Sequence, residues 1–133
     1  MKQVFESQVT IPFHMADPAG IVFFGHVFSI AHAEYEKWLS AELGSWDKWF
    51  SNPEWIAPIK KTEAEYLAPM KAGDNVAVKI FVKNITESSF TTYYELSSKN
   101  QLCAKVEVLQ VFCDKKTFKK ISIPDAAKKV ISK

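Results

Sequence analysis

At 133 residues, the chain is long enough for one domain with a sizeable core, and its 47% hydrophobic and 24% charged content is that of an ordinary globular protein. No apolar run approaches the ~20 residues that cross a bilayer, and the N-terminus has no apolar signal-peptide stretch, so we expect a single cytoplasmic domain over residues 1–133 without membrane contact. The net charge of +2 is weak and all 17 basic residues are lysine, which argues against specific nucleic-acid binding because arginine usually makes the bidentate contacts.

The predicted elements, taken in chain order, begin with a strand over residues 4–11, where apolar and polar residues alternate. A loop over residues 14–20 leads into a helix from about residue 24 to residue 43, and a one-turn helix is expected within residues 45–55. From there the pattern becomes that of β-strands. These strands cover residues 56–67, 75–85, 90–96, 101–113 and 118–123.

The long helix carries an apolar stripe, because large hydrophobic residues recur along it at spacings of three and four. The stripe consists of Phe24, Phe28, Ala31, Tyr35, Trp38, Leu39 and Leu43. Gly44 is a good terminator after it. A helix of this kind in a small protein usually packs on a sheet, so the order of strand, long helix and antiparallel meander predicts an α+β fold. A final short helix begins at Pro124 and Asp125, with Ala127, Val130 and Ile131 turned inward.

Four aromatic residues follow the long helix within a short span, namely Trp46, Trp49, Phe50 and Trp55. They either cover the core as a lid or line an apolar ligand pocket or subunit contact.

Several kinds of chemistry are excluded by what the sequence lacks. The two cysteines, Cys103 and Cys113, lie on one predicted strand about 33 Å apart and cannot bridge each other. His14, His26 and His32 are too loosely spaced to indicate a metal site, and we expect none. There is no G-x-S-x-G elbow, no H-E-x-x-H motif and no phosphate-binding glycine loop.

A carboxylate in front of the long helix remains as the candidate for chemistry. Asp17 is the only acidic residue between Glu6 and Glu34 and has apolar neighbours. No Ser, Thr, Asp or Asn stands where the helix should be capped, so its first N–H groups are free to bind a carbonyl oxygen or an anion. A carboxylate beside such donors is a plausible hydrolytic site, although an Asp before a Pro is more often only a turn residue.

The stretch Asp17-Pro18-Ala19-Gly20-Ile21-Val22-Phe23-Phe24 resembles the hotdog-fold thioesterases of the 4-hydroxybenzoyl-CoA thioesterase family. The later stretch from Ala57 to Tyr66, followed by Gly73-Asp74, also looks like that family's second strand and turn. The resemblance covers nearly the whole chain. It implies a hotdog fold, in which a mainly antiparallel sheet of five to six strands wraps a long central helix.

The resemblance also implies roles for particular residues. Asp17 is the catalytic carboxylate, as nucleophile or general base, and the backbone amide of Phe24 holds the thioester oxygen. The surrounding substrate-binding positions are Gly20, Val22, Phe23, Gly25 and His26. The family works as a homodimer or homotetramer with sites between subunits, so the partner chain borders the site with Pro58, Ile59, Lys60 and Lys61. Coenzyme A enters as part of the substrate, and no cofactor is implied.

The sequence departs from the family where related aroyl-CoA enzymes carry a basic cluster for the nucleotide, because this chain has Thr86-Glu87-Ser88-Ser89 there. Lysines elsewhere must serve, or the acyl group arrives on an acyl carrier protein. His26 either faces the site or is an exposed residue of the first helical turn. Two other functions stay open: a non-catalytic acyl-thioester binding or regulatory module, and a hydratase, for which no His–carboxylate pair stands out.

Overall fold

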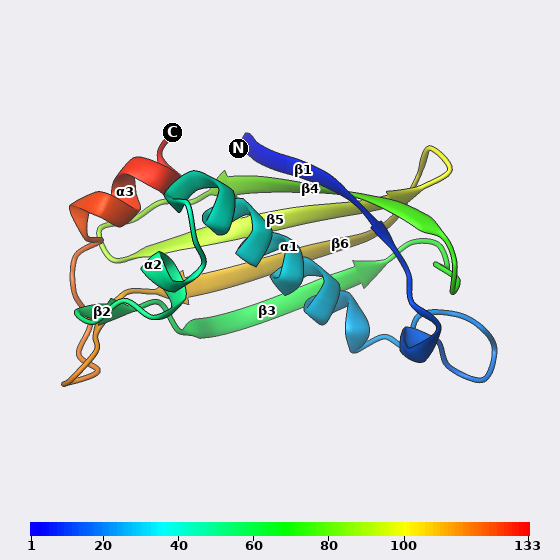
Figure 1. The fold of residues 1–133 in the computed structure, drawn as a ribbon, viewed down its shortest axis with the longest axis horizontal. Helices are drawn as coiled ribbons and strands as arrows, with labels where there is room; N and C mark the ends of the chain where they lie inside the picture. Colours follow the sequence, from blue (N-terminus) through cyan, green and yellow to red (C-terminus); the bar gives the residue numbers. More distant parts are fainter.

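The computed structural model describes residues 1–133, in which one long helix lies across one face of a five-stranded antiparallel sheet (Figure 1). The strand order in this sheet is β1-β4-β5-β6-β3. Its strands are β1 (Lys2–Thr10), β3 (Ile59–Tyr66), β4 (Asn75–Lys83), β5 (Ser89–Ser98) and β6 (Gln101–Val111). A separate two-stranded sheet joins β2 (Trp55–Ile56) to β7 (Cys113–Asp114). The helices are η1 (Phe13–Met15), α1 (His26–Leu43), α2 (Asp47–Phe50) and α3 (Asp125–Ile131).

The core lies between α1 and the sheet, as the apolar patterns predict. On β4 every second residue is buried, and Ala31, Tyr35, Trp38 and Leu39 of the predicted stripe are buried on α1. Phe24 was expected in this stripe, but its side chain is 64% exposed. The reason is that α1 begins at His26, so Phe24 lies in the turn before the helix and does not follow the helical periodicity.

A buried carboxylate on α1 departs from the apolar pattern. The side chain of Glu34 is fully buried beneath β1, where the Ser7 hydroxyl donates a hydrogen bond to it. The Lys37 ammonium lies 2.6 Å from the other carboxylate oxygen. These two partners satisfy a charge that would otherwise be costly to bury.

Two strand predictions need correction. The strand predicted over residues 56–67 is broken around Pro58, which has no N–H for a ladder, so Ile56 pairs with β7 while β3 starts at Ile59. The strand predicted over residues 118–123 is absent, and only an isolated bridge joins Lys120 to Cys113. The predicted meander holds for β4, β5 and β6, whereas β3 crosses to the far edge beside β6.

The remaining predictions concern the ends of the molecule. The α3 residues expected to face inward are buried, namely Ala127, Val130 and Ile131. The two cysteines, Cys103 and Cys113, are unpaired, as expected. Trp49 and Trp55 pack edge-on against Phe112 in the core, which confirms the lid interpretation for these two residues. Trp46 is 53% exposed. No helix combines the length and the apolar character needed to cross a membrane.

Candidate active site

The loop that carries Asp17 is closed on itself by backbone hydrogen bonds. The Asp17 N–H donates to the Ile21 carbonyl at 2.8 Å, and the Gly20 N–H donates to the Asp17 carbonyl at 2.9 Å. Gly20 has a φ of +80°, a conformation that side chains disfavour, which explains why glycine stands here. A bridge from Ala16 to Val22 closes the base of the loop. The fold therefore fixes where the Asp17 side chain begins.

The Asp17 carboxylate is half-buried and uses only one of its oxygens. Oδ1 accepts hydrogen bonds from the Ala19 N–H at 2.9 Å and the Ile21 N–H at 3.3 Å. Oδ2 accepts none from the protein. One oxygen therefore holds the side chain in place, while the other is available for a substrate or a water molecule.

The start of α1 offers the free donors that the sequence predicts. No side chain caps the helix at Gly25, and the backbone N–H groups of Phe24 and Gly25 donate to no acceptor in the chain. The Phe24 carbonyl is held instead by the Tyr66 hydroxyl, which donates to it at 2.5 Å. Tyr66 thereby ties the end of β3 to the turn that precedes α1. The positive end of the helix dipole adds to the pull of these free N–H groups on an oxygen atom.

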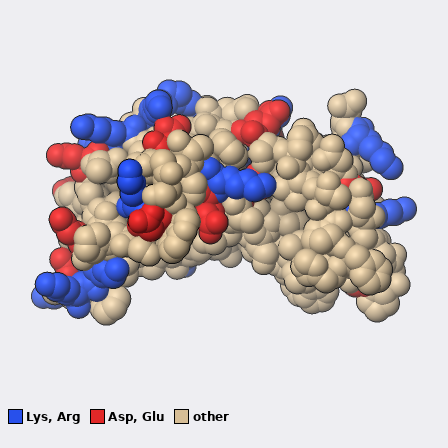
Figure 2. All heavy atoms as spheres, in the orientation of Figure 1, with Lys and Arg blue, Asp and Glu red and all other residues tan.

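The neighbourhood of this turn is apolar. The Val22 N–H donates to the Met70 carbonyl at 2.7 Å, which joins the loop to the segment after β3. A hollow of about 290 Å³ lies between the two, lined by Ile21, Val22, Tyr66, Leu67, Ala68, Pro69 and Met70. Phe23 and Phe24 are 46% and 64% exposed. Figure 2 shows the end of the molecule that carries η1 and this loop as a largely uncharged lobe.

The structure brings together only part of the predicted site. Five of the predicted residues lie beside Asp17, in the loop, the turn and the first position of α1, namely Gly20, Val22, Phe23, Gly25 and His26. The His26 ring packs edge-on against Phe23 at a centroid distance of 5.8 Å. These six residues therefore form one local unit, in which the orientation of His26 toward a substrate stays a prediction.

The four residues predicted at the partner side lie elsewhere in the chain. They are exposed and lie at the start of β3, namely Pro58, Ile59, Lys60 and Lys61. The residue that contacts the helix start is Tyr66, at the other end of β3. Tyr66 lies seven positions after Ile59 along the extended strand, which is about 23 Å. Lys60 sits at an irregularity in the pairing of β3 with β6. A single chain therefore does not place these residues beside Asp17.

A second hollow lies at the start of β3, between α1 and α2. Its volume is about 340 Å³, and its lining residues are His32, Trp49, Phe50, Ile56, Ala57, Pro58, Ile59 and Gln110. Burial lowers the pKa of His32 below its usual value, against a smaller opposing effect of Glu36. Trp49 and Phe50 thus both cover the core and line a hollow, and the binding of an apolar ligand there stays a prediction.

Sequence reasoning missed Tyr66 and Gln110. For Gln110 a signal was present, because it continues the inward-facing alternation of Ala104, Val106 and Val108 on β6 and is polar where the pattern requires an apolar residue. For Tyr66 no signal existed in the sequence, since its contact with Phe24 depends on how β3 crosses the sheet.

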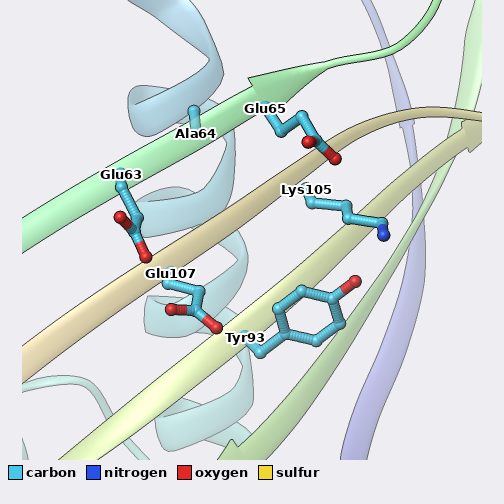
Figure 3. Close-up of a pocket in the computed structure, with 6 residues that line it drawn as sticks. All are labelled: Glu63, Ala64, Glu65, Tyr93, Lys105 and Glu107. Carbon is cyan, nitrogen blue, oxygen red and sulfur yellow. The ribbon is translucent and has the colours of Figure 1, made fainter.

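A third hollow lies on the outer face of the sheet, away from α1. Figure 3 shows Glu63, Glu65, Tyr93, Lys105 and Glu107 pointing away from the helix. Lys83 pairs with Glu107, which lowers the pKa of that carboxyl, and burial followed by the Glu95 charge raises the pKa of Tyr93 to about 12. Glu107 is paired with Lys83, and the hollow lies on the paired strands β3, β5 and β6, so it does not combine a carboxylate with an uncapped helix start as the Asp17 loop does.

Comparison with known proteins gives a consistent result. A family model described as the thioesterase-like superfamily matches residues 11–131. A 1,4-dihydroxy-2-naphthoyl-CoA hydrolase of Nostoc punctiforme is 30% identical over 116 residues, which are 87% of this chain and 78% of that protein. The homologue from Microcystis aeruginosa, which has the same name, is 30% identical over 113 residues, covering 84% of this chain and 81% of its own length.

The solved structures agree with the observed fold. A 1,4-dihydroxy-2-naphthoyl-CoA thioesterase from Synechocystis superposes with a TM-score of 0.88 at 25% identity, covering 96% of this chain and 95% of its own. This likeness confirms the hotdog fold with its long helix and antiparallel sheet. With its fold and nearly its whole length matched, the chain belongs to the thioesterase-like superfamily.

Proposed function

We propose that this chain hydrolyses aromatic acyl-CoA thioesters, with Asp17 as the catalytic carboxylate and the helix-start N–H groups as the oxyanion donors. The observation that carries the proposal is the pairing of an unused oxygen, Asp17 Oδ2, with the unused N–H groups of Phe24 and Gly25 on one short stretch. Thioester hydrolysis needs both kinds of group, because negative charge develops on the carbonyl oxygen while water or a nucleophile attacks the carbon.

The chemistry follows from these two groups. The thioester oxygen accepts from the Phe24 N–H, and the field of the α1 N-terminus stabilises the charge that develops on it. Asp17 either takes a proton from the water that attacks the carbonyl carbon, or attacks that carbon itself to give a mixed anhydride, which water then hydrolyses. In both routes the C–S bond breaks, the CoA thiolate leaves and is protonated, and Asp17 returns to its starting state.

The aromatic acyl group is proposed from two observations. The similar proteins from Nostoc punctiforme and Microcystis aeruginosa bear the name of a hydroxynaphthoyl-CoA hydrolase. The hollow at the start of β3 has aromatic and aliphatic walls, and its size of about 340 Å³ is in the range of small-molecule pockets.

A second copy of the chain completes the proposed site. β3 is an edge strand whose residues are exposed except for Ala64, so it can pair with β3 of another copy. In an antiparallel pair of identical strands, the start of one lies opposite the end of the other. Such pairing carries Ile59, Lys60 and Lys61 of one chain to the Tyr66 end of its partner, beside that partner's Asp17. The proposed roles of the two lysines therefore depend on a homodimer built on this strand, and pairing of two such dimers would give the homotetramer.

A thiol-release screen tests the proposed function. Purified protein is mixed with acetyl-, isobutyryl-, palmitoyl-, benzoyl- and 1,4-dihydroxy-2-naphthoyl-CoA, and with one aromatic acyl group loaded on an acyl carrier protein. We expect the highest kcat/KM with the aromatic CoA esters. Binding without release of thiol from any ester would instead indicate a binding module. A preference for the carrier-bound ester would indicate that the acyl group arrives on an acyl carrier protein and not on CoA.

Tyr66 is proposed as a positioning residue, because its hydroxyl holds the carbonyl of the residue whose N–H receives the thioester oxygen. The Tyr66→Phe variant is expected to lower kcat about 3- to 10-fold, the equivalent of one hydrogen bond, while KM and the melting temperature stay unchanged. Steady-state kinetics measure kcat and KM, and thermal unfolding measures the melting temperature. Tyr93→Phe on the outer face of the sheet is the matched control, and equal losses in the two variants would remove this role from Tyr66.

A further inference from the structure

The turn after β7 presents an aromatic side chain whose position the core does not explain. Phe118 is 70% exposed, and its backbone φ is +59°. Of the four non-glycine residues with a positive φ it is the only aromatic one, and glycine would adopt this conformation without strain. An exposed apolar residue is ordinary by itself, but here the chain holds a bulky ring in a strained turn without burying it. This combination points to a function for the ring.

Backbone hydrogen bonds hold the ring in place. The Phe118 N–H donates to the Asp114 carbonyl at 2.8 Å, and the Asp114 N–H donates to the Lys119 carbonyl at 2.8 Å. The Lys119 N–H also donates to the Thr117 hydroxyl oxygen at 3.2 Å. A closed turn therefore presents the ring to solvent.

Four lysines flank Phe118, and all four are exposed, namely Lys115, Lys116, Lys119 and Lys120. We call residues 115–120 the basic turn. The Lys115 ammonium donates to the Asn52 carbonyl at 3.0 Å, whereas no carboxylate forms an ion pair with any of the four. Figure 2 shows blue side chains gathered at the lower-left end of the molecule, where Figure 1 draws the orange turn beside β2. Unpaired ammonium groups around an exposed ring suit a ligand that carries both phosphates and a flat base.

The basic turn adjoins the hollow at the start of β3. Ile56 of β2 pairs with Cys113 of β7, and Ile56 also lines that hollow. The Lys115 N–H donates to the Glu54 carbonyl at 3.0 Å, which ties the turn to the segment before β2. In the antiparallel β3 pairing proposed above, this end of one chain lies at the Asp17 end of its partner. The turn is therefore attached to one wall of the proposed site.

We propose that the basic turn binds the nucleotide of coenzyme A, with the adenine stacked on Phe118 and the phosphates on Lys116, Lys119 and Lys120. This inference rests on the proposed function and deepens it, because it names the residues that recognise the carrier in place of the basic cluster absent from residues 86–89. Coenzyme A joins a pyrophosphate and a ribose phosphate to an adenine ring, so it offers a partner to both kinds of side chain. An acidic carrier protein or an anionic lipid surface also attracts lysines, but the attachment of the turn to the wall of the hollow favours the nucleotide of a bound thioester.

Two esters of the same acid test the proposal, benzoyl-CoA and S-benzoyl-pantetheine, which lacks the nucleotide. For wild type at low salt we expect kcat/KM to be about 10- to 100-fold higher for the CoA ester, through a lower KM, and the ratio to fall as salt is added. In Phe118→Gly the ratio falls about 5-fold or more while the melting temperature stays unchanged, because glycine fits the turn. Phe118→Trp keeps an aromatic ring and should keep the ratio.

The lysines have a matched control on α3. Lys116→Gln combined with Lys119→Gln removes two charges from the basic turn and is expected to lower the ratio about 5-fold or more. Lys128→Gln combined with Lys129→Gln removes two exposed charges from α3 and should keep the ratio. An equal loss in the two double variants would show a general attraction to the net charge of the protein and would overturn the proposal.

Binding of CoA itself separates this inference from the proposed function. CoA without an acyl group is titrated onto wild type, Asp17→Asn and Phe118→Gly by calorimetry. If no ester is hydrolysed, or if Asp17→Asn is as fast as wild type, the proposed function fails. The present inference stands in either case when CoA binds about 5-fold or more weakly to Phe118→Gly than to wild type.

Three results would overturn the inference. One is a wild type that hydrolyses the CoA ester and the pantetheine ester with equal kcat/KM. Another is a CoA affinity that Phe118→Gly leaves unchanged. The third is sedimentation with phosphatidylglycerol vesicles that depends on Phe118 while the affinity for CoA does not, which would assign the basic turn to an anionic lipid surface.

Discussion

Asp17→Asn is expected to release thiol from an aromatic acyl-CoA about 10³-fold more slowly than wild type, because it removes the charge that activates water or attacks the carbonyl. The fold of the loop should persist. The asparagine side-chain oxygen can still accept from the Ala19 and Ile21 N–H groups, as Oδ1 of Asp17 does. The measurement is kcat by thiol detection, with circular dichroism and size-exclusion chromatography to verify the folded state and the oligomer.

Asp114 provides the matched control for this substitution. Its carboxylate also accepts two backbone N–H bonds in a turn, from Lys116 at 2.8 Å and Thr117 at 2.9 Å. Those bonds lower the pKa of the Asp114 carboxyl. Asp114→Asn should keep the wild-type kcat. A similar rate in Asp17→Asn and wild type would show that Asp17 is only a turn residue.

Trp38→Ala is expected to lower the free energy of unfolding by about 3–5 kcal/mol, the usual range when a large aromatic side chain is removed from a core. Trp38 is 1% exposed on the face of α1 that packs on the sheet. Because α1 positions the free N–H groups, loss of this contact should also lower activity at temperatures where wild type is fully folded. Urea unfolding at a fixed protein concentration measures the change.

Trp46→Ala is the control for the loss of a tryptophan as such. Trp46 follows α1 closely but is 53% exposed, so its truncation should change the unfolding free energy by less than about 1 kcal/mol. If the two variants unfold at the same urea concentration, the long helix does not owe its stability to this contact with the sheet.

The fold was predictable from the sequence because its main signals are periodic. The inward alternation of β4 and the spacing of Ala31, Tyr35 and Trp38 on α1 are local patterns that survive in the folded protein. The errors arose where a signal was not periodic. Phe24 has the right spacing but precedes the helix, and Pro58 breaks a stretch that is otherwise β-like.

The candidate site was harder to predict from the sequence than the fold, for two physical reasons. Asp17 and the uncapped helix start are adjacent in sequence, so a single stretch indicates both, although the catalytic role itself came from the family resemblance. Tyr66 and Gln110 reach their neighbours only through the crossing of β3 and its pairing with β6, which no local pattern encodes. The roles proposed for Pro58 to Lys61 depend on a second chain, which a single sequence cannot place. Their roles and the catalytic roles stay predictions.

The central claim is that the thioester lies between Asp17 and the free N–H groups at the start of α1. A crystal structure of Asp17→Asn with an intact aromatic acyl-CoA tests it most directly. We predict the thioester oxygen within hydrogen-bond distance of the Phe24 N–H, the substituted side chain at position 17 on the opposite side of the carbonyl carbon, and β3 of a second chain closing the site. A thioester bound away from position 17, for instance on the outer face of the sheet beside Tyr93, would contradict the claim.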